Sequence, residues 1–513
     1  MCRFIAMRYN AATMYNACRL LLSIIGLAFL VACASYPLNA PIDEIDLSSG
    51  YRLENLALGD RNSDEIFVIL ALSGGGVRAA ALDFGVMQQL ERVRFGDDGR
   101  SLLDEVDIIS SSSGASIPAA YYGLYGKDAF FNDFTDDVLH MPMQSAITRR
   151  VLSPGNWFRQ MSGKFSRGDV VSEYLDETIF DGHTFADIKL QRPLILLNAT
   201  DMGIGAQFSF TQGMFDQLCS DLSQFHVARA VTASMAFTPA FTPIALKNYN
   251  DGSCGHTAPD WAQEALENGV EDDPAVFAAA EHVLSYQDIE TRPYIHLLDS
   301  GITDNIGIRT PVLAFKIRDA PASQVSHIED GTIKKVVVIL VNARPRSDFA
   351  GDLSPKPPSA ITSVQAAASR PLANYSYETV NEVRRDIDDV RDRLARYHET
   401  RKDCRSHSEM MCADQGPGDS CRDRAITSCF EEFGVTSAAS PPDLEIFLVH
   451  LNFDLIDNIE RRERYETIPT TLQLSKEDVD ALIDIAPELL REEPEFQALL
   501  YDLGAEFPSS DSQ

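Results

Sequence analysis

The stretch EIFVILALSGGGVRA, residues 65–79, decides the fold of this chain. Residues 66–72 form an unbroken apolar run, which is typical of a strand buried on both faces of a parallel sheet. Three glycines at 74–76 interrupt the run, and apolar residues at helical spacing follow as far as Val93. The pattern therefore predicts a strand, a glycine loop and a helix, in that order.

A second unit of the same kind follows. Residues 106–109 have the pattern of a strand, a serine run occupies 110–113, and Pro118 suits only the first turn of a helix. Further strand-like runs lie at 193–197, 294–298 and 335–341. Strands that alternate with helical stretches predict an α/β fold with a mainly parallel central sheet, and an active site at the carboxyl ends of its strands.

The glycine loop predicts an anion site. Gly74, Gly75 and Gly76 leave backbone N–H groups uncovered by side chains. A phosphate loop would need Gly-Lys-Ser/Thr and a dinucleotide loop would need G-x-G-x-x-G, and the chain has neither sequence here. The anion that remains is the transient oxyanion of an acyl transfer, with a purely structural turn as the alternative.

The serine run has the position of a nucleophile elbow. In hydrolases this strand-to-helix turn has the consensus sequence G-x-S-x-G. The corresponding residues here are SSSGA at 111–115, with Ser113 at the centre. Ser111 and Ala115 replace the outer glycines by the next smallest side chains, so we expect a tighter turn. A turn and helix cap without catalytic function is the alternative.

Taken together, these units resemble the patatin-like phospholipase family. Four blocks follow the family order: LSGGGVRA at 72–79, DIISSSSGAS at 107–116, ARAVTASMAFTP at 228–239 and LDSGITDN at 298–305; NATD at 198–201 also fits a family strand end. The resemblance covers about residues 65–345. It implies a three-layer α/β/α fold and a lipid acyl hydrolase that needs neither a metal nor a cofactor.

The resemblance also assigns roles by position. It implies that Ser113 is the nucleophile and Asp299 its base, and that Gly74, Gly75 and Gly76 stabilise the oxyanion. Arg78 matches an arginine that supports this loop or contacts the lipid phosphate. The chain departs from the family pattern at Ala79, Ser111, Ala115 and Ser300.

A catalytic triad with histidine is the mechanistic alternative. His327, His398, His407 and His450 follow Asp299, as the order in α/β-hydrolases requires, but none lies in a recognisable motif. His296 lies three residues before Asp299 on the same predicted strand, so its side chain should point to the opposite face. We therefore expect a Ser–Asp dyad, with an aspartate that must be partly desolvated to act as a base.

The N-terminus predicts a lipoprotein signal peptide over residues 1–32. Three arginines precede an apolar run at 20–32, which is shorter than the roughly 20 residues that span a bilayer. The run ends in LVAC, which resembles a bacterial lipobox with Cys33 as the lipidated residue. Ala34 follows in place of the aspartate that favours inner-membrane retention. We therefore expect a periplasm-facing lipoprotein of the outer membrane; a simple signal peptide, a retained anchor and a start at Met14 are the alternatives.

Six cysteines follow Cys33, an even number that predicts disulfides in an exported protein. We expect Cys219 to pair with Cys254. The remaining four are Cys404, Cys412, Cys421 and Cys429, whose three connectivities stay open. A zinc site is the alternative, although their spacing is wider than that of zinc ligand pairs.

The domain organisation follows from these patterns. A tether or lead segment occupies 33–64, and the acyl-hydrolase core 65–345. A helical Cys-rich insertion is predicted at 373–440, because apolar residues recur at helical spacing over 377–400 before the clustered cysteines. A C-terminal strand and helices at 441–513 should pack on the core.

The net charge of −32 argues against nucleic acid as a partner, because phosphate binding needs basic patches. The leading hypothesis is a phospholipase A or lysophospholipase that acts on membrane lipid. An esterase or thioesterase on other acyl substrates would use the same residues. A non-catalytic scaffold lipoprotein on a degenerate patatin fold is the alternative that the altered elbow suggests.

Overall fold

The computed structural model describes residues 38–505 and Phe507, apart from 239, 319–321, 346–354, 356, 413–419 and 433–443. The predicted signal peptide and Cys33 lie outside the described residues. None of the helices that it describes has the length and apolarity needed to cross a bilayer.

The core is an eight-stranded sheet with the order β12-β11-β2-β5-β6-β10-β9, in which β7 also pairs with β6. The strands are β2 (Ile66–Leu72), β5 (Val106–Ser111), β6 (Leu194–Asp201), β7 (Ala206–Ser209), β9 (Ile244–Lys247), β10 (Tyr294–Leu298), β11 (Lys335–Asn342) and β12 (Glu445–Asn452). β12, β11, β2, β5 and β6 are parallel neighbours, whereas β7 and β10 each pair antiparallel with β6, and β9 pairs antiparallel with β10. The prediction of a mainly parallel central sheet is confirmed.

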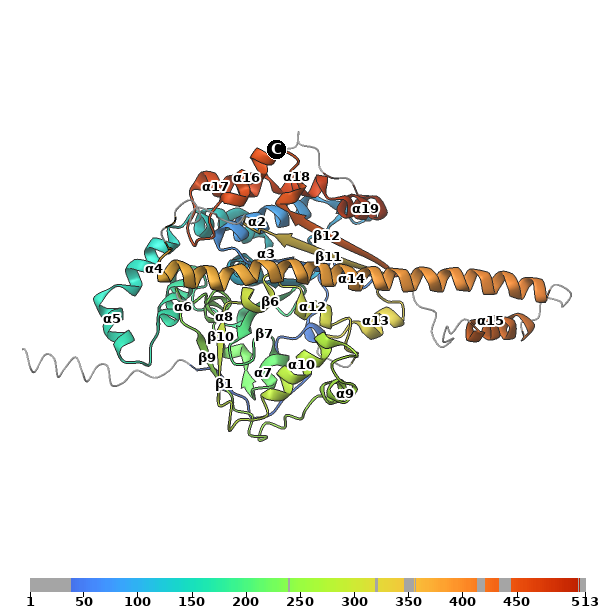
Figure 1. Ribbon diagram of the computed structural model, residues 1–513, viewed down its shortest axis with the longest axis horizontal. Coiled ribbons are helices and arrows are strands. Elements are labelled where there is room, and N and C mark those ends of the chain that lie inside the picture. Colours follow the sequence, from blue (N-terminus) through green and yellow to red (C-terminus); the bar gives the residue numbers. More distant parts are fainter. Residues whose placement is uncertain are drawn as a thin grey trace, which may run out of the picture.

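Helices cover both faces of the sheet. Ile195 of β6 points toward α3 (Ser116–Phe134), so closely that a Cβ on Gly123 would lie 2.7 Å from it. Leu194 and Leu196 point the other way, into a cavity of about 650 Å³ that α14 (Ala360–Met411), α12 (Arg309–Leu313) and α10 (Pro274–Ser285) also line. Figure 1 shows α2 (Val77–Arg92), α17 (Lys476–Asp484) and α18 (Ala486–Glu492) above β11 and β12, and α10 and α12 below them. The predicted three layers are present.

The segment before β2 is packed more closely than its polar sequence suggests. Tyr51 is buried, and its hydroxyl accepts a hydrogen bond from the Ile195 N–H at 2.7 Å. Arg52 forms a buried ion pair with Asp216 at 2.6 Å. The short strand β1 (Ala40–Pro41) pairs with β8 (Ser220–Asp221). Buried Tyr51, the buried ion pair of Arg52 and the pairing of β1 with β8 thus hold residues 38–64, predicted as a tether or lead, against the core.

Disulfides fix the irregular parts of the chain. Cys219 pairs with Cys254, as predicted. The four clustered cysteines adopt the nested connectivity, in which Cys404 pairs with Cys429 and Cys412 with Cys421. The sulfur atoms that the zinc alternative required are therefore bonded to one another.

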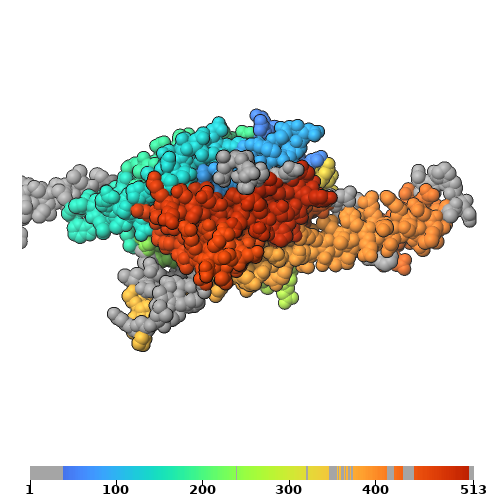
Figure 2. All heavy atoms as spheres, turned by 90° about the horizontal axis from the view of Figure 1, so that it is seen from above, coloured from blue at the N-terminus to red at the C-terminus, as the bar shows by residue number. Residues whose placement is uncertain are grey.

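The nested disulfides join the far end of α14 to α15 (Ser420–Glu432). The part of α14 near Val380 and Val383 packs on the core, whereas the part that carries the disulfides extends beyond the sheet (Figures 1 and 2). The predicted helical, disulfide-rich region is confirmed.

The C-terminal helices close the face of the sheet that α2 covers. α17 and α18 lie against α2, and α19 (Pro494–Leu503) lies against β12. Ser475 caps α17 by accepting a hydrogen bond from the Asp478 N–H. The loop before α17 also meets the glycine loop, because the Val77 N–H donates to the Thr471 carbonyl oxygen at 2.9 Å.

Candidate active site

Ser113 lies on a strained turn between β5 and α3. β5 ends at Ser111, a single 3-10 turn covers Ser113–Ala115, and α3 begins at Ser116. Ser113 has φ of 51°, a left-handed backbone conformation that residues other than glycine rarely adopt. Its side chain remains partly accessible. Strain of this kind is typical of a nucleophile elbow, where it holds Oγ clear of the sheet.

The altered positions of the elbow fit without distortion. The Ser111 hydroxyl donates to the Leu196 carbonyl oxygen at 3.1 Å, and Ala115 is fully buried. Gly114 is the position that tolerates no side chain, because a Cβ there would lie 2.5 Å from Gly76. The elbow and the glycine loop therefore touch each other through glycine.

The structure places Asp299 beside Ser113. The Ser113 hydroxyl donates to Asp299 Oδ2 at 2.9 Å. Asp299 follows β10, whose last residue, Leu298, pairs with Thr200 near the carboxyl end of β6. The Thr200 hydroxyl donates to the Asp299 carbonyl oxygen at 2.8 Å and fixes that turn. The antiparallel strand β10 thus places the Asp299 carboxylate at the same edge of the sheet where the parallel strand β5 places Ser113.

Burial makes Asp299 a stronger base than an exposed aspartate. The residue is 5% exposed, and desolvation raises its pKa to about 6. The Gly301 N–H, which donates to Oδ1 at 2.9 Å, and the Ser113 hydroxyl partly offset this increase in pKa. The carboxylate is therefore ionised at neutral pH and hydrogen-bonded to the proton that it would accept.

The glycine loop offers two free donors rather than three. The Gly74 N–H donates to the Asn305 carbonyl oxygen at 2.9 Å and is therefore occupied. The N–H groups of Gly75 and Gly76 have no acceptor among the residues that the structure describes. They lie directly before the first turn of α2, where the helix dipole favours negative charge. Sequence reasoning gave no sign that Asn305 would occupy the first donor.

Arg78 lies beneath this loop. The side chain is fully buried, and its Nη2 lies 3.3 Å from the position that a Cβ on Gly75 would occupy. Burial lowers its pKa to about 9, and its guanidinium nitrogens have no hydrogen-bond acceptor within the described part of the chain. Of the two roles that the resemblance implied, burial favours support of the loop over contact with a lipid phosphate.

Sequence reasoning missed a cluster of buried serines behind Ser113. The Ser113 N–H donates to the hydroxyl oxygens of Ser300 at 2.8 Å and Ser234 at 3.0 Å. The Ser300 hydroxyl also pairs with that of Ser112 at 2.7 Å, and the Ser234 hydroxyl with that of Ser116 at 2.8 Å. Ser300 in place of the family glycine was the one signal available. The cluster connects the elbow, the aspartate turn and the end of α8 (Val227–Ser234).

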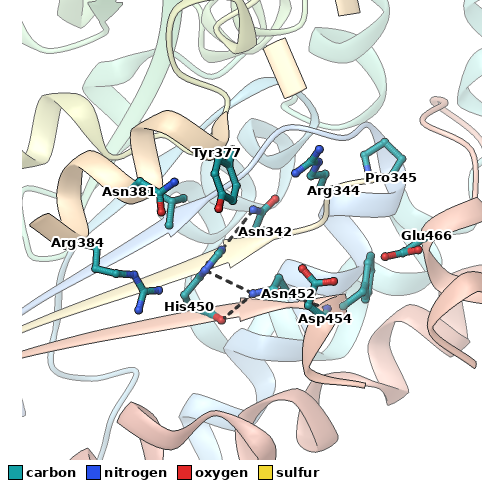
Figure 3. A pocket seen from close by; sticks show the side chains of 12 residues that line it. Asn342, Arg344, Pro345, Tyr377, Asn381, Arg384, His450, Asn452, Asp454 and Glu466 are labelled. Atoms are coloured by element: carbon teal, nitrogen blue, oxygen red, sulfur yellow. Dashed lines mark hydrogen bonds between the residues drawn. The ribbon is translucent and has the colours of Figure 1, made fainter. Parts of the chain in front are cut away.

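The structure does not support the alternative of a triad with histidine, because neither His450 nor His296 contacts Ser113 or Asp299. His450 lies at the end of β12, in a cavity of about 590 Å³ under α14 (Figure 3). Its ring is within 3.3 Å of the Asn342 side-chain amide and 3.4 Å of that of Asn452, and burial lowers its pKa to about 4. His296 is exposed on β10. The hydrogen bonds of the Asp299 carboxylate go to Ser113 and Gly301 instead.

Comparison with known proteins places this site in a family. The model of the family described as patatin-like phospholipase matches residues 70–312. No curated protein matches the sequence. Among solved structures, human GIVD cytosolic phospholipase A2 is similar at 12% identity and a TM-score of 0.40, over 86% of this chain and 62% of that one. The chain spans less than two thirds of that structure.

The family match contains the glycine loop, Ser113 and Asp299, in the order in which the structure brings them together. Residues 70–312 of this chain form a patatin-like phospholipase domain.

Proposed function

We propose that the protein is a lipid acyl hydrolase that cleaves carboxylic esters of membrane lipids, as a phospholipase A or lysophospholipase, through the dyad Ser113–Asp299. One observation carries the proposal. A serine with φ of 51° donates to a buried aspartate at 2.9 Å, next to a glycine loop with two free N–H groups. Such a site supplies a nucleophile, a base and oxyanion donors.

The first half of the reaction forms an acyl-enzyme. Asp299 accepts the Ser113 proton while Oγ attacks the ester carbonyl carbon. The N–H groups of Gly75 and Gly76 stabilise the oxyanion, and each such donor is worth roughly 3 kcal/mol of transition-state energy. When the intermediate collapses, the ester C–O bond breaks and the leaving alkoxide takes the proton from Asp299.

The second half reverses these roles. Asp299 accepts a proton from water, whose oxygen attacks the acyl carbon. Collapse of the second oxyanion breaks the bond to Ser113 Oγ, which recovers the proton and releases the fatty acid. Arg78 contributes indirectly, because a buried positive charge beneath the glycine loop favours negative charge above it.

Site mapping with a fluorophosphonate probe tests the nucleophile. The probe should label Ser113 alone, as mass spectrometry of the labelled peptide would show, and Ser113→Ala should abolish labelling with an unchanged circular dichroism spectrum. Failure of the folded protein to label would favour a non-catalytic scaffold.

A substrate panel tests the substrate class. We expect fatty acid release from diacyl or lysophospholipid to exceed turnover of thioesters and of simple esters of matched chain length. The reverse preference would support the esterase or thioesterase alternative.

We also propose that the protein is a lipoprotein anchored through Cys33 and facing the periplasm from the outer membrane. The proposal rests on the apolar run at 20–32, the LVAC sequence that ends it, and Ala34. Metabolic labelling with an alkyne fatty acid should mark the chain and be lost in Cys33→Ser. Labelling that survives this substitution would contradict the anchor.

A further inference from the structure

The helix α5 (Pro154–Met161) presents its apolar face to solvent. Leu152, Trp157, Phe158 and Met161 are 74%, 57%, 41% and 67% exposed, and no residue of α5 is buried. The Trp157 and Phe158 rings lie 5.4 Å apart. We call these four residues the α5 patch. A cluster of large exposed apolar side chains marks an interaction site more often than chance exposure does.

The polar face of α5 is the side that holds the helix to the protein. The Asn156 side chain donates to the Arg150 carbonyl oxygen, and the Gln160 side chain to that of Val151. Arg159 forms a bidentate ion pair with Glu173 of α6 (Arg167–Thr178) at 2.6 and 2.8 Å. A surface helix of a soluble protein usually has the opposite orientation, with its apolar side toward the core.

The surroundings of the α5 patch are basic in a chain of net charge −32. Residues 138–168 contain five Lys or Arg and no Asp or Glu. Glu177 and Glu173 pair with two of the five, Arg150 and Arg159. The other three are Arg149, Lys164 and Arg167, which are exposed and form no ion pair within the described ranges. Trp, Phe and Leu flanked by Lys and Arg are characteristic of segments that lie in the membrane interface.

The α5 patch lies on the catalytic side of the molecule. In Figure 1 the arrowheads of β11 and β12 point toward the side from which α5 projects, and Ser113 follows the end of their parallel neighbour β5. A short series of contacts connects α6, the helix after α5, to Ser113. Asp169 of α6 forms an ion pair with Arg229 of α8 at 2.7 Å, and α8 ends at Ser234, which accepts the Ser113 N–H.

We infer that the α5 patch docks the protein on a phospholipid bilayer, with Trp157, Phe158 and Met161 inserted at the boundary between headgroups and acyl chains. The flanking basic residues remain among the headgroups and offset, locally, the repulsion that the acidic chain would feel at an anionic surface. This inference deepens the proposed function, on which it rests, because it names a bilayer as the physical form of the substrate.

Fluorescence of Trp157 tests the inference directly. The chain has two tryptophans, so Trp261→Phe leaves Trp157 as the only reporter. With phosphatidylcholine vesicles, with or without phosphatidylglycerol, we expect its emission to shift to the blue. Phosphatidylcholine brominated on the acyl chains should quench it. The matched control is Trp157→Phe, which leaves the more buried Trp261 and should show neither change.

Vesicle partitioning gives a second, independent measurement. In a chain that carries Cys33→Ser and Ser113→Ala, the triple substitution Trp157→Ala, Phe158→Ala and Met161→Ala should weaken partitioning on the order of a hundredfold. The control is Met410→Ala with Met411→Ala, which removes side chains that are at least about as exposed from the far end of α14 and should leave partitioning unchanged. Because neither readout uses turnover, failure of the docking surface is distinguishable from failure of the hydrolase.

Two results would overturn the inference. One is Trp157 emission that vesicles neither shift nor quench, whether or not the chain sediments with them. This result would assign the α5 patch to a protein partner. The other is equal partitioning of the triple variant and its parent.

Discussion

Two polar sites lie at the carboxyl edge of the same sheet, and they use burial in opposite ways. At the ends of β5 and β10, burial raises the pKa of Asp299 to about 6 and improves it as a base. At the ends of β11 and β12, burial lowers the pKa of His450 to about 4 and leaves a neutral ring between two asparagines. The first site also has a serine with a strained backbone, Ser113, and free N–H donors. A buried titratable group therefore becomes a candidate catalyst through the geometry around it rather than through its pKa alone.

The largest expected effect separates the two sites by mutation. Ser113→Ala and Asp299→Asn should each lower fatty acid release by at least about 10³-fold, because the nucleophile and its base act as a unit. His450→Gln should change the rate by less than about threefold, since its ring contacts neither residue of the dyad. Release of labelled fatty acid from phospholipid, in variants with the parent circular dichroism spectrum, measures all three. A large loss in His450→Gln would restore the histidine mechanism.

The next effect concerns the glycine loop. Gly76 has φ of 62°, and a Cβ there would lie 2.4 Å from the Thr471 carbonyl oxygen. Gly76→Ala should therefore displace an oxyanion donor and lower kcat on the order of a hundredfold. Gly99 is a matched control, because it has the same φ of +62° but no atom within 4 Å of its Cβ position. Gly99→Ala should carry the strain of a positive φ without the clash and leave kcat unchanged; equal losses in both variants would assign the effect to strain.

A smaller and continuous effect is the pH dependence of the rate. The base must be ionised, so kcat/KM should rise with pH and level off above about 6, falling about tenfold per pH unit below that value. His450→Gln should leave this profile in place. Profiles of kcat/KM between pH 4 and 9 on a soluble ester measure it, and an inflection near pH 4 would contradict a desolvated Asp299.

Two parts of the candidate site could be predicted from the sequence because each is local. The strand, glycine loop and helix at 65–93, and the serine after 106–109, follow from patterns that each span a few residues. The approach of Asp299 to Ser113 needed the family resemblance, because no local pattern encodes a contact between residues 186 positions apart.

What the sequence could not reveal depends on backbone contacts and packing directions between distant segments. The Asn305 carbonyl oxygen occupies the Gly74 donor, and Ser234 reaches the Ser113 N–H across 121 positions. The outward apolar face of α5 was also hidden. Its period matches that of any amphipathic helix, and periodicity does not say which side of a helix meets the core.

The two sites should change the stability of the folded state with pH in opposite directions. The pKa of Asp299 is higher in the folded chain than the unfolded value of 3.8. The folded state then binds more protons, and its stability falls as pH rises from about 4 to about 6. The pKa of His450 is lower than its unfolded value of 6.5, because burial and the positive charge of Arg384 lower it by more than Asp454 raises it. Here the unfolded state binds more protons, and stability falls as pH drops from about 6.5 to about 4.

Each site should therefore destabilise the fold by about 3 kcal/mol at its unfavourable end of the pH range. Asp299→Asn should gain stability over the parent at pH 8 and little at pH 4, whereas His450→Gln should gain at pH 4 and little at pH 8. Urea unfolding at the two pH values measures both, with Ser113→Ala as a control that leaves the His450 titration in place and, because it removes a hydrogen bond to the carboxylate, raises the pKa of Asp299 further. A gain at the same pH for both variants would mean that burial does not act on the two groups in opposite directions, and a pH-independent gain in Asp299→Asn would show that the carboxylate is solvated in the folded state.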